Sequence, residues 1–316
     1  MLAIIDGSYY LHRALHQPAM RKMRTRAGVL SGGVFGFLRA LSYTLNAVQA
    51  TKAICVWDGR RSKRRKLLFP EYKSKTHKPI EDGFDYLPEY RASREAVIEV
   101  LPKLGVRSLC LPRLEGDDTI YRVKRSFRNW RPTEGIMILS EDRDMWQLID
   151  HLCSVYRPHA EEYVTLDNQD ARTGVSGTEE YLMWRALSGD SSDHIKGVTG
   201  VGDTRAIQLV NEARPLRLAY GWELGEAVKA VAAERKKVKW AQAVVAQWDT
   251  VVRNLELMDL RKEPVTHREK QIIRNCVRNP CSMGSPAILY DFLDRFELAS
   301  LREDMDKWTR PFRKLT

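Results

Sequence analysis

The stretch GIMILSEDRD, residues 135–144, joins an apolar run directly to two aspartates, Asp142 and Asp144. A continuous apolar run of this length is typical of a strand that is buried on both faces, as in a parallel sheet. Three other stretches have the same form: LAIID at 2–6, AICVWD at 53–58 and VRSLCLPRLE at 106–115. Since each of them also leads into an acidic residue, the sequence predicts buried strands with carboxylates at their ends.

Segments with helical periodicity separate these runs. Apolar residues recur every three or four positions in 34–48, and the segments 96–104 and 119–130 have the same spacing. Alternation of strands and helices predicts an α/β fold with a parallel sheet and right-handed crossovers. Sites in such folds form at the carboxyl ends of the strands. We therefore expect acids that are far apart in the sequence to meet at one edge of the sheet.

Nine carboxylates fall into short clusters at or beyond these predicted strand ends. They are Asp6, Asp58, Glu115, Asp117, Asp118, Asp142, Asp144, Asp190 and Asp193. Crowding like charges is costly unless a cation holds them together, and Mg²⁺ and Mn²⁺ prefer carboxylate oxygens. Two such ions about 4 Å apart are well suited to phosphodiester hydrolysis. Helix capping explains any one cluster equally well, but it is a poor account of all of them together.

The overall charge indicates the class of partner. Lys+Arg number 52 against 41 Asp+Glu, which gives a net charge of +11. Such an excess favours nucleic acid or an acidic membrane surface, although a generically basic protein has the same composition. No apolar run is long enough to cross a membrane, and the N-terminus lacks a signal-peptide pattern. The five scattered cysteines resemble reduced thiols, so we expect a cytoplasmic protein without membrane contact.

A long basic segment and a glycine-rich turn stand outside the strand-helix alternation. Residues 60–79 carry nine lysines and arginines against one glutamate, so we expect a mobile arch over 60–88 that closes on phosphates, with a solvated loop as the alternative.

From about residue 178 the pattern is helical, and GVTGVG at 197–202 offers backbone N–H groups to a phosphate, although an ordinary turn explains it as well. We predict an α/β core over 1–177 and a helical region over 178–316.

Five motifs, in order, resemble the 5′-nuclease superfamily, which includes flap endonucleases, the 5′-nuclease domain of bacterial DNA polymerase I and phage ribonuclease H type exonucleases. The motifs are DG at 6–7, WDG at 57–59 with FPEYK at 69–73, LEGDD at 114–118, LSEDRDMWQL at 139–148 and ALSGDSSDHIKGVTGVG at 186–202. Because we expect no polymerase segment, the chain looks most like the stand-alone phage members. His194 departs from the family, which usually has asparagine there, and Thr204-Arg205 replaces a usual Lys-Thr pair.

The resemblance implies a PIN-like parallel-sheet core, a basic helical arch and a C-terminal helix-hairpin-helix at about 186–212. It also implies two Mg²⁺ or Mn²⁺ ions. One would be surrounded by Asp6, Asp58, Glu115, Asp117 and Asp118, the second would be served by Asp190 and Asp193, and Asp142 and Asp144 would lie between them. Lys73 would contact the scissile phosphate as a catalytic residue together with Asp142 and Asp144, and Tyr72 would stack on a base.

The nucleic-acid contacts implied by the resemblance and by the basic segment lie in the arch and the hairpin, where relatives also bind K⁺. They are Arg60, Arg61, Arg64, Arg65, Tyr72, Lys73, Lys75, Gly197, Gly200, Gly202, Thr204 and Arg205.

The implied activity is that of a metal-dependent 5′-3′ exonuclease and flap endonuclease. It would cut branched or nicked DNA and RNA primers on DNA during replication, leaving a 5′-phosphate. We expect a monomer, with a single-strand binding protein or a sliding clamp as candidate partners. Two alternatives stay open: a structure-specific DNA-binding paralogue without catalysis, and an RNA nuclease of the PIN type, against which the glycine hairpin argues.

Overall fold

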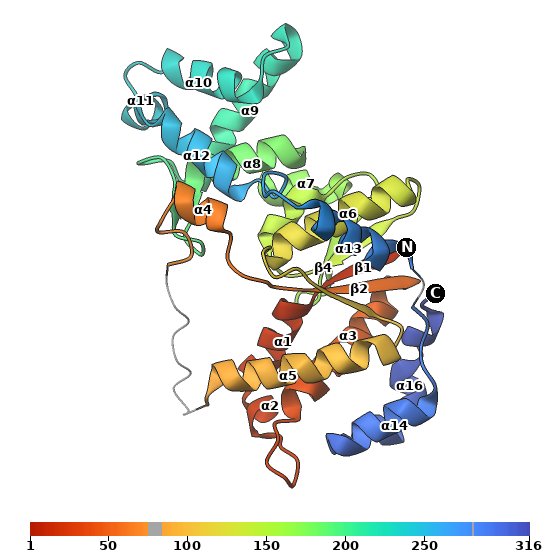
Figure 1. The fold of residues 1–316 in the computed structure, drawn as a ribbon. Helices are drawn as coiled ribbons and strands as arrows, with labels where there is room; N and C mark the ends of the chain where they lie inside the picture. Colours follow the sequence, from red (N-terminus) through yellow and green to blue (C-terminus); the bar gives the residue numbers. More distant parts are fainter. Residues whose placement is uncertain (75–83, 280) are drawn as a thin grey trace.

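The centre of the fold is a six-stranded sheet with the order β3-β2-β1-β4-β5-β6. A computed structural model describes residues 1–74, 84–279 and 281–316, and Figure 1 shows its arrangement. The strands are β1 (Leu2–Asp6), β2 (Lys52–Trp57), β3 (Arg107–Cys110), β4 (Ile136–Leu139), β5 (Cys153–Arg157) and β6 (Glu162–Val164). The pairs from β3 across to β5 are parallel, and β6 is antiparallel to β5. The predicted α/β fold with a parallel sheet is therefore confirmed.

The apolar runs became buried strands because the two faces of each run enter different hydrophobic clusters. Along β1, Leu2 and Ile4 belong to one cluster, whereas Ala3 and Ile5 belong to the other. Side chains alternate across a strand, so a run without polar residues fits a sheet that is covered on both sides. β1 lies between β2 and β4, where the order of the strands reverses. In open α/β sheets, ligand sites form at such a switch point.

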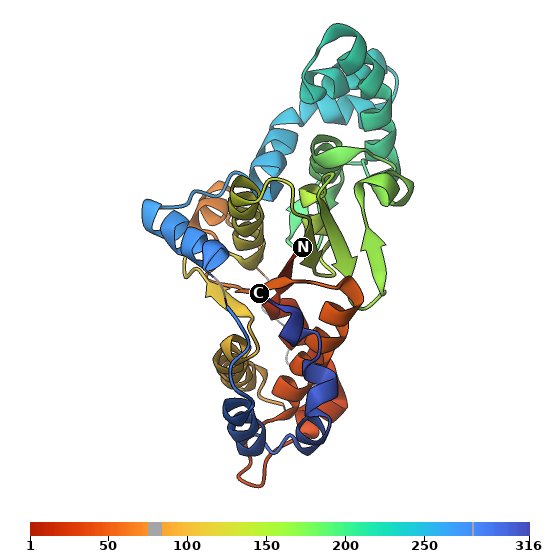
Figure 2. The ribbon, with the colours of Figure 1, turned by 90° about the vertical axis from the view of Figure 1, so that its right-hand side faces the viewer.

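Helices from both ends of the chain cover the Ala3 face. This layer and its connections comprise α1 (Gly7–His16), α2 (Pro18–Lys22), α3 (Gly32–Val48), α5 (Tyr86–Val100), η1 (Leu101–Lys103), α14 (Pro286–Arg295), α15 (Ala299–Glu303), α16 (Met305–Thr309) and η3 (Phe312–Lys314). The two termini lie close together on one side of the molecule, at the right in Figure 1 and facing the viewer in Figure 2. There the Met1 ammonium donates to Thr51 Oγ1 at 3.0 Å and the Thr316 N–H donates to Thr51 O at 2.8 Å.

The Leu2 face is covered by helices that continue into a helical lobe at one end of the molecule, as Figure 2 shows. The elements on this side are α6 (Gly116–Trp130), η2 (Arg143–Leu148), α7 (Leu166–Thr173), α8 (Gly177–Ser188), α9 (Asp203–Tyr220), α10 (Leu224–Glu234), α11 (Lys239–Ala246), α12 (Trp248–Met258) and α13 (His267–Arg278). A single hydrophobic cluster extends from Leu2 in the sheet to Val251 in α12. The division at residue 177 stays a prediction, since the core on this side is continuous across it.

Some predicted elements differ from those in the structure. β5 and β6 were not predicted from the sequence, and the region predicted to be helical from about residue 178 contains the short hairpin of β7 (Gly189–Asp190) and β8 (Ile195–Lys196) as well as helices. Asp190 and Asp193 lie on this hairpin. Within the described part of the arch, Lys63–Leu68 forms the short helix α4.

Among the described residues, no helix has both the length and the apolar character needed to cross a membrane.

Candidate active site

The carboxyl ends of four parallel strands bring the predicted acids together. Asp6 is the last residue of β1 and caps α1, where its Oδ1 accepts from the Tyr9 N–H at 2.9 Å. Asp58 follows β2, and Glu115 is the N-cap residue of α6, in the connection after β3. Asp142 follows β4 and caps η2. The chain therefore changes from a loop to a helix within LEGDD, with Glu115 as the N-cap residue and Asp117 and Asp118 in the first turn.

The first group of acids lies between β1, β2 and α6. Burial and the nearby Asp58 raise the pKa of Asp6 to about 7, although Oδ2 also accepts a hydrogen bond from Ser140 Oγ at 2.8 Å. Burial and the nearby Asp142 raise the pKa of Asp117 well above its usual range. Such shifts are expected where carboxylates crowd together without a compensating cation.

Asp58 is held in this group by the backbone of α6. Its Oδ1 accepts from the Gly116 N–H at 2.6 Å, and the Asp58 N–H donates to Ser8 Oγ at 3.1 Å. A Cβ on Gly116 would lie 2.8 Å from the same Asp58 oxygen. Glycine at this position therefore gives the Asp58 carboxylate room against the helix.

The second group of acids comprises Asp144, Asp190 and Asp193. Burial and the nearby Asp142 raise the pKa of Asp144 well above its usual range, and burial raises that of Asp193 to about 6. Burial would also raise the pKa of Asp190, but Ser192 and Arg185, which donates to it at 2.6 Å, outweigh that effect and lower it. The nearby Asp142 contributes to the raised pKa of members of both groups, and its role between two ions stays a prediction.

Lys73 spans the two groups. Its Nζ donates to Glu115 Oε2 at 2.8 Å and lies 3.6 Å from Asp193 Oδ2. Burial alone would lower the pKa of Lys73, but Tyr72 and the neighbouring acids outweigh it and raise the pKa. The Lys73 N–H also donates to Asp193 O at 3.1 Å, which fixes the end of the described arch to the β7–β8 hairpin. One ammonium thus partly offsets the charge of two carboxylate groups.

The chemistry of these side chains fits hard divalent cations, because the donors are carboxylate oxygens. Burial, together with neighbouring carboxylates, raises the pKa values of Asp6, Asp117, Asp144 and Asp193, so a bound cation would stabilise their charged forms. Within the described ranges, no three acidic, histidine or cysteine side chains converge closely enough to enclose an ion as they stand. Mutual repulsion and the pairing of Glu115 with Lys73 are physical reasons for that spacing.

Asp118 does not fit its predicted place as a metal ligand. Its two carboxylate oxygens accept from the Arg65 guanidinium, each at 2.7 Å, and both residues are buried. Arg65 Nε donates to Leu257 O at 2.8 Å, which leaves this arginine facing the protein rather than nucleic acid. The pair ties α4, α6 and the end of α12 together.

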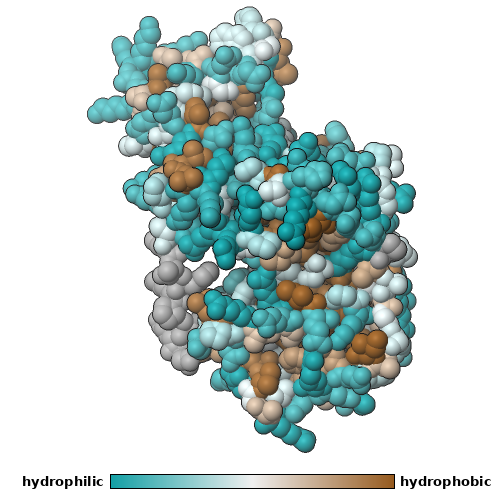
Figure 3. Space-filling model, in the orientation of Figure 1, coloured by the Kyte–Doolittle hydropathy of each residue, from teal (hydrophilic) through white to brown (hydrophobic). Residues whose placement is uncertain are grey.

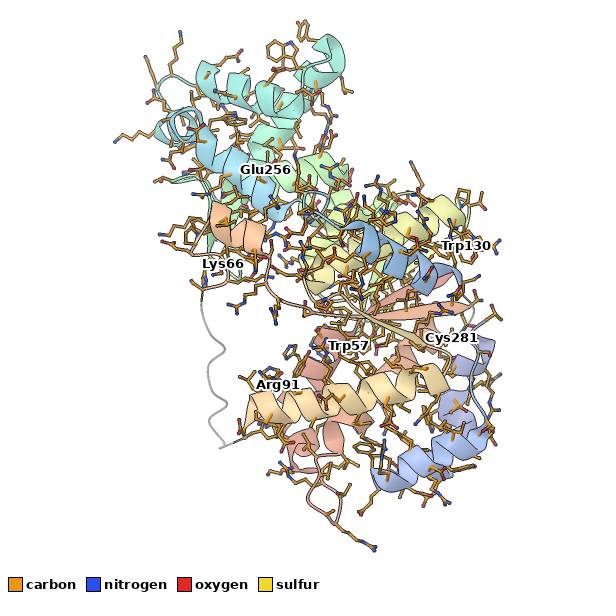
Figure 4. The ribbon with its side chains drawn as sticks, in the orientation of Figure 1. Trp57, Lys66, Arg91, Trp130, Glu256 and Cys281 are labelled. Carbon is orange, nitrogen blue, oxygen red and sulfur yellow. The ribbon has the colours of Figure 1, made fainter. Side chains whose placement is uncertain are left out.

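Other predicted nucleic-acid contacts are also engaged inside the protein. Tyr72 is buried and donates to Glu115 Oε2 at 3.0 Å, so its ring is not available to stack on a base in this arrangement. Arg64 donates to Glu263 and to Glu256 O, and Figure 4 shows Lys66 and Glu256 on these facing elements.

The remaining predicted contacts of the arch are exposed or lie outside the described residues. Arg60 and Arg61 are exposed, and the Arg61 guanidinium donates to Lys73 O. Lys75 lies outside the described residues, so its predicted contact stays a prediction.

The predicted glycine hairpin lies at the N-terminus of α9. Gly200 has a φ of +78°, and a Cβ on Gly197 would lie 2.4 Å from Leu187 O, so both positions favour glycine. Gly202 is the N-cap residue of α9, Thr204 and Arg205 are exposed in its first turn, and Arg205 donates to Gly200 O.

A cleft of about 770 Å³ lies between this hairpin and the second acidic group. It is lined by Ser74, Arg185, Asp190, His194 and Gly202 among others. His194 has a φ of +61°, a conformation in which asparagine is enriched, which explains the residue that the family usually has there.

The sequence analysis did not identify the groups that position the acids. The Ser140 hydroxyl donates to Asp6, and the Arg185 guanidinium pairs with Asp190. The backbone N–H of Ser62 donates to Glu115 Oε1 at 2.8 Å. Ser140 was visible as part of the LSEDRD motif, but its role as a partner of Asp6 was not. Arg185 lies five residues before Asp190, and that closeness in sequence was the available signal.

The raised pKa values predict that the metal-free protein loses stability as the pH rises. Asp6, with a pKa of about 7, and Asp193, with a pKa of about 6, ionise at about 3.9 when unfolded. Their contribution is fully present below pH 4 and is lost as the pH rises to about 7. Glu115 and Asp190 have lowered pKa values, so their opposite effect falls below about pH 4.5. In EDTA, the melting temperature should fall by roughly 5 °C between pH 5 and pH 7.5.

The control for this pH profile is Asp6→Asn, which removes the titrating group and keeps its shape. The variant should show a flatter profile and a higher melting temperature at pH 7.5. A profile as steep as that of the unmodified protein would show that Asp6 does not carry the effect.

Comparison with known proteins identifies the family of the chain. Residues 1–175 match the family model described as the 5′-3′ exonuclease N-terminal resolvase-like domain. The 5′-3′ exonuclease of Bacillus subtilis is 30% identical over 222 residues, covering 67% of this chain and 70% of that protein. The 5′-3′ exonuclease of Buchnera aphidicola from Acyrthosiphon pisum is 28% identical, covering 66% of this chain and 69% of its own length.

Solved structures share the fold over nearly the whole chain. The D15 protein of bacteriophage T5, co-crystallised with metal ions, has a TM-score of 0.65 at 18% identity and covers 94% of this chain and 98% of its own. Flap endonuclease-1 from Methanococcus jannaschii has a TM-score of 0.57 at 16% identity, covering 98% of this chain and 92% of its own. At these identities the likeness bears on the fold, and the family is carried by the sequence matches. Since the family model spans more than half of the 316 residues, the chain belongs to the 5′-3′ exonuclease family and is a nuclease.

Proposed function

We propose that this nuclease is a divalent-metal-dependent, structure-specific 5′-3′ exonuclease and flap endonuclease. Its substrates would be the 5′ ends of branched or nicked DNA and of RNA primers on DNA, as in replication. The observation that carries the proposal is the meeting of two acidic groups at the strand ends, with Asp142 between them and Lys73 across them.

The proposed cofactors are two Mg²⁺ or Mn²⁺ ions. Asp6, Asp58, Glu115 and Asp117 would hold one ion, and Asp144, Asp190 and Asp193 would hold the other, with Asp142 between them. The T5 relatives were crystallised with metal ions, including zinc, which supports divalent binding by this fold. When bound, such ions would lower the pKa of a water molecule and offset the charge that develops on the reacting phosphate.

The residues of the chain would position the substrate strand for this reaction. The Lys73 ammonium, which lies beside Glu115 and Asp193, would donate to an oxygen of the phosphate to be cut. The exposed Arg60 and Arg61 would contact neighbouring phosphates, and the hairpin at 197–202 would hold the duplex backbone through N–H groups at the start of α9. The T5 flap endonuclease and the catalytic core of Rad2, which share the fold, were solved with DNA.

The finer features of this proposal extend the resemblance. We propose a K⁺ ion at the hairpin, action as a monomer, and cooperation with a single-strand binding protein or a sliding clamp. Ser74 Oγ lies 3.2 Å from Nδ1 of His194, so the residue at this position contacts the end of the described arch.

Replacing Lys73 with alanine should reduce single-turnover cleavage by about 100-fold while duplex affinity changes by less than about threefold. The reason is that a donor aimed at the reacting phosphate acts mainly in the transition state. Single-turnover rates and dissociation constants in Ca²⁺, measured on one flap substrate, would separate the two effects. Equal losses in rate and affinity would place Lys73 in general backbone contact.

The direct test of the function is a 5′-end-labelled flap substrate incubated with Mg²⁺ and, in parallel, with EDTA. Short labelled products that need Mg²⁺ are expected, with cuts near the junction. Tight binding without cleavage would favour a DNA-binding paralogue. Cleavage limited to RNA would favour an RNA nuclease of the PIN type.

A further inference from the structure

A basic groove lies between α6 and α13, outside the acidic site. The groove has a volume of about 520 Å³. We call it the α6–α13 groove, and its lining residues are Arg122, Arg125, Ser126, Asn129, Pro264, Val265, Lys270, Ile273, Arg274 and Arg278. Five of them are cations, and none is acidic. Lys270, Arg274 and Arg278 are spaced four residues apart, so they project from one side of α13.

The cations of this groove lack ion-pair partners among the described residues, since none of the five lies within 4.0 Å of a carboxylate oxygen there. Two cations on the opposite side of α6, in contrast, form ion pairs. Lys124 pairs with Asp150 at 2.8 Å, and Arg128 pairs with the same carboxylate at 3.3 Å. The positive charge of the groove is therefore not compensated from within the described protein.

Arg122 lines the groove, and one of its hydrogen-bond donors has no acceptor among the described residues. Its guanidinium donates to Arg261 O at 3.0 Å and to Glu263 O, but its Nε is buried and has no hydrogen-bond partner among the described residues. Burial lowers the pKa of Arg122, and the neighbouring Arg125 lowers it further. The nearest carboxylates do not relieve this, because Glu263 already accepts from Ser62 and Arg64. A buried donor without a protein acceptor, among unpaired cations, is suited to contact an anionic group.

The groove lies on the helix that also carries part of the acidic site. Asp117 is in the first turn of α6, and Arg122 follows five residues later, which is about 7 Å along the helix axis. Its lining on α6 runs from Arg122 to Asn129, and Figure 4 labels Trp130, the last residue of this helix. In Figure 3, the face on which α4, α6 and α13 lie is mostly hydrophilic. A nucleic-acid strand that leaves the acidic site along α6 would reach these cations within a few nucleotides.

We propose that the α6–α13 groove binds backbone phosphates of the substrate nucleic acid, close to the bond that is cut. The proposal rests on the proposed function in that it takes nucleic acid as the substrate. Arginine offers a fork of donors to phosphate, and Lys270 adds a point charge. Ser126 and Asn129 add hydroxyl and amide donors at the same wall. Contacts of this kind position a strand without reading its bases.

The test compares two triple variants that lose the same charge. The groove variant is Lys270→Gln, Arg274→Gln and Arg278→Gln, and all three side chains are exposed, so the fold should be kept. The control variant is Lys307→Gln, Arg310→Gln and Arg313→Gln, which changes exposed cations at and beyond α16. Binding of a fluorescent flap duplex is measured by anisotropy in EDTA, from 50 to 200 mM KCl, with melting temperatures as a folding check.

We expect the groove variant to bind at least about tenfold more weakly, with a plot of log affinity against log salt that is shallower by about 2 to 3 units. This follows because each lost phosphate contact removes about 0.9 from that slope. The control should change the affinity by less than about threefold and leave the slope unchanged.

Two results would overturn the proposal. Equal losses in both variants would mean that only net charge matters. Loss of inorganic phosphate binding by calorimetry, with unchanged affinity for the flap duplex, would assign the groove to a free anion instead. Since the assay requires no cleavage, failure of the nuclease assay would leave its result readable on its own.

Discussion

Replacing Asp142 with asparagine should lower Mg²⁺-dependent cleavage by at least about 10³-fold, which corresponds to about 4 kcal/mol of transition-state stabilisation. Asp142 raises the pKa of both Asp117 and Asp144, so it is the acid that both groups share. Asparagine keeps an oxygen that can accept from the Asp144 N–H, as Asp142 Oδ1 does at 2.8 Å, so the cap of η2 should persist. The loss should therefore come from the missing charge and not from local unfolding.

The measurement is single-turnover cleavage of a flap substrate, with affinity measured separately in EDTA. Without metal, the variant should bind the substrate at least as tightly as the unmodified protein, because one negative charge near the phosphates has been removed. Asp167→Asn is the matched control, since Asp167 is exposed in the first turn of α7. Wild-type turnover by Asp142→Asn would contradict the proposed metal role.

Replacing Asp118 with alanine should lower the free energy of unfolding by about 3 to 5 kcal/mol, because it leaves the buried Arg65 guanidinium without its partner. Burial alone would lower the pKa of Arg65, but Asp118 outweighs it and raises the pKa, so the guanidinium stays charged in place. Urea unfolding in EDTA would measure the loss. The prediction treats Asp118 as a structural residue.

The double variant Arg65→Met with Asp118→Leu is the control. It removes both charges and fills similar space, so it should recover most of the stability lost by Asp118→Ala. If Asp118→Ala instead kept its stability and lost the stabilisation conferred by Mg²⁺, Asp118 would be a metal ligand as the sequence first indicated.

The strands and the place of the site could be predicted because both depend on short-range pattern. The apolar run 135–139 has no polar face to expose, so it requires cover on both sides, and residues after such a run lie at the sheet edge. Asp6, Asp58 and Asp142 are found there for that reason. In contrast, β5 and β6 lie toward the edge of the sheet, and half-exposed side chains such as Tyr163 give no continuous apolar run.

The partners of charged and polar side chains could not be predicted. A basic segment looks the same in sequence whether its arginines face phosphate or protein, and the acceptors of Arg64 and Arg65 come from about residue 256, far along the chain. Tyr72 looked like a stacking residue, but burial against Leu257 and a bond to Glu115 place it inside the protein. These outcomes depend on tertiary contacts that no local spacing reveals.

The short segment around Leu257 has a consequence for how such proteins can be recombined. The carbonyl groups of Leu257 and Met258 accept hydrogen bonds from Arg65 and Gln147, respectively. Two side chains of the N-terminal half therefore find their acceptors in a segment more than 100 residues further along the chain. A chimaera that joins two relatives at residue 177 would take the donors from one parent and the acceptors from the other. An exchange of the hairpin and its helices between homologues should therefore keep Arg65 and Gln147 with the segment around Leu257 from the same parent.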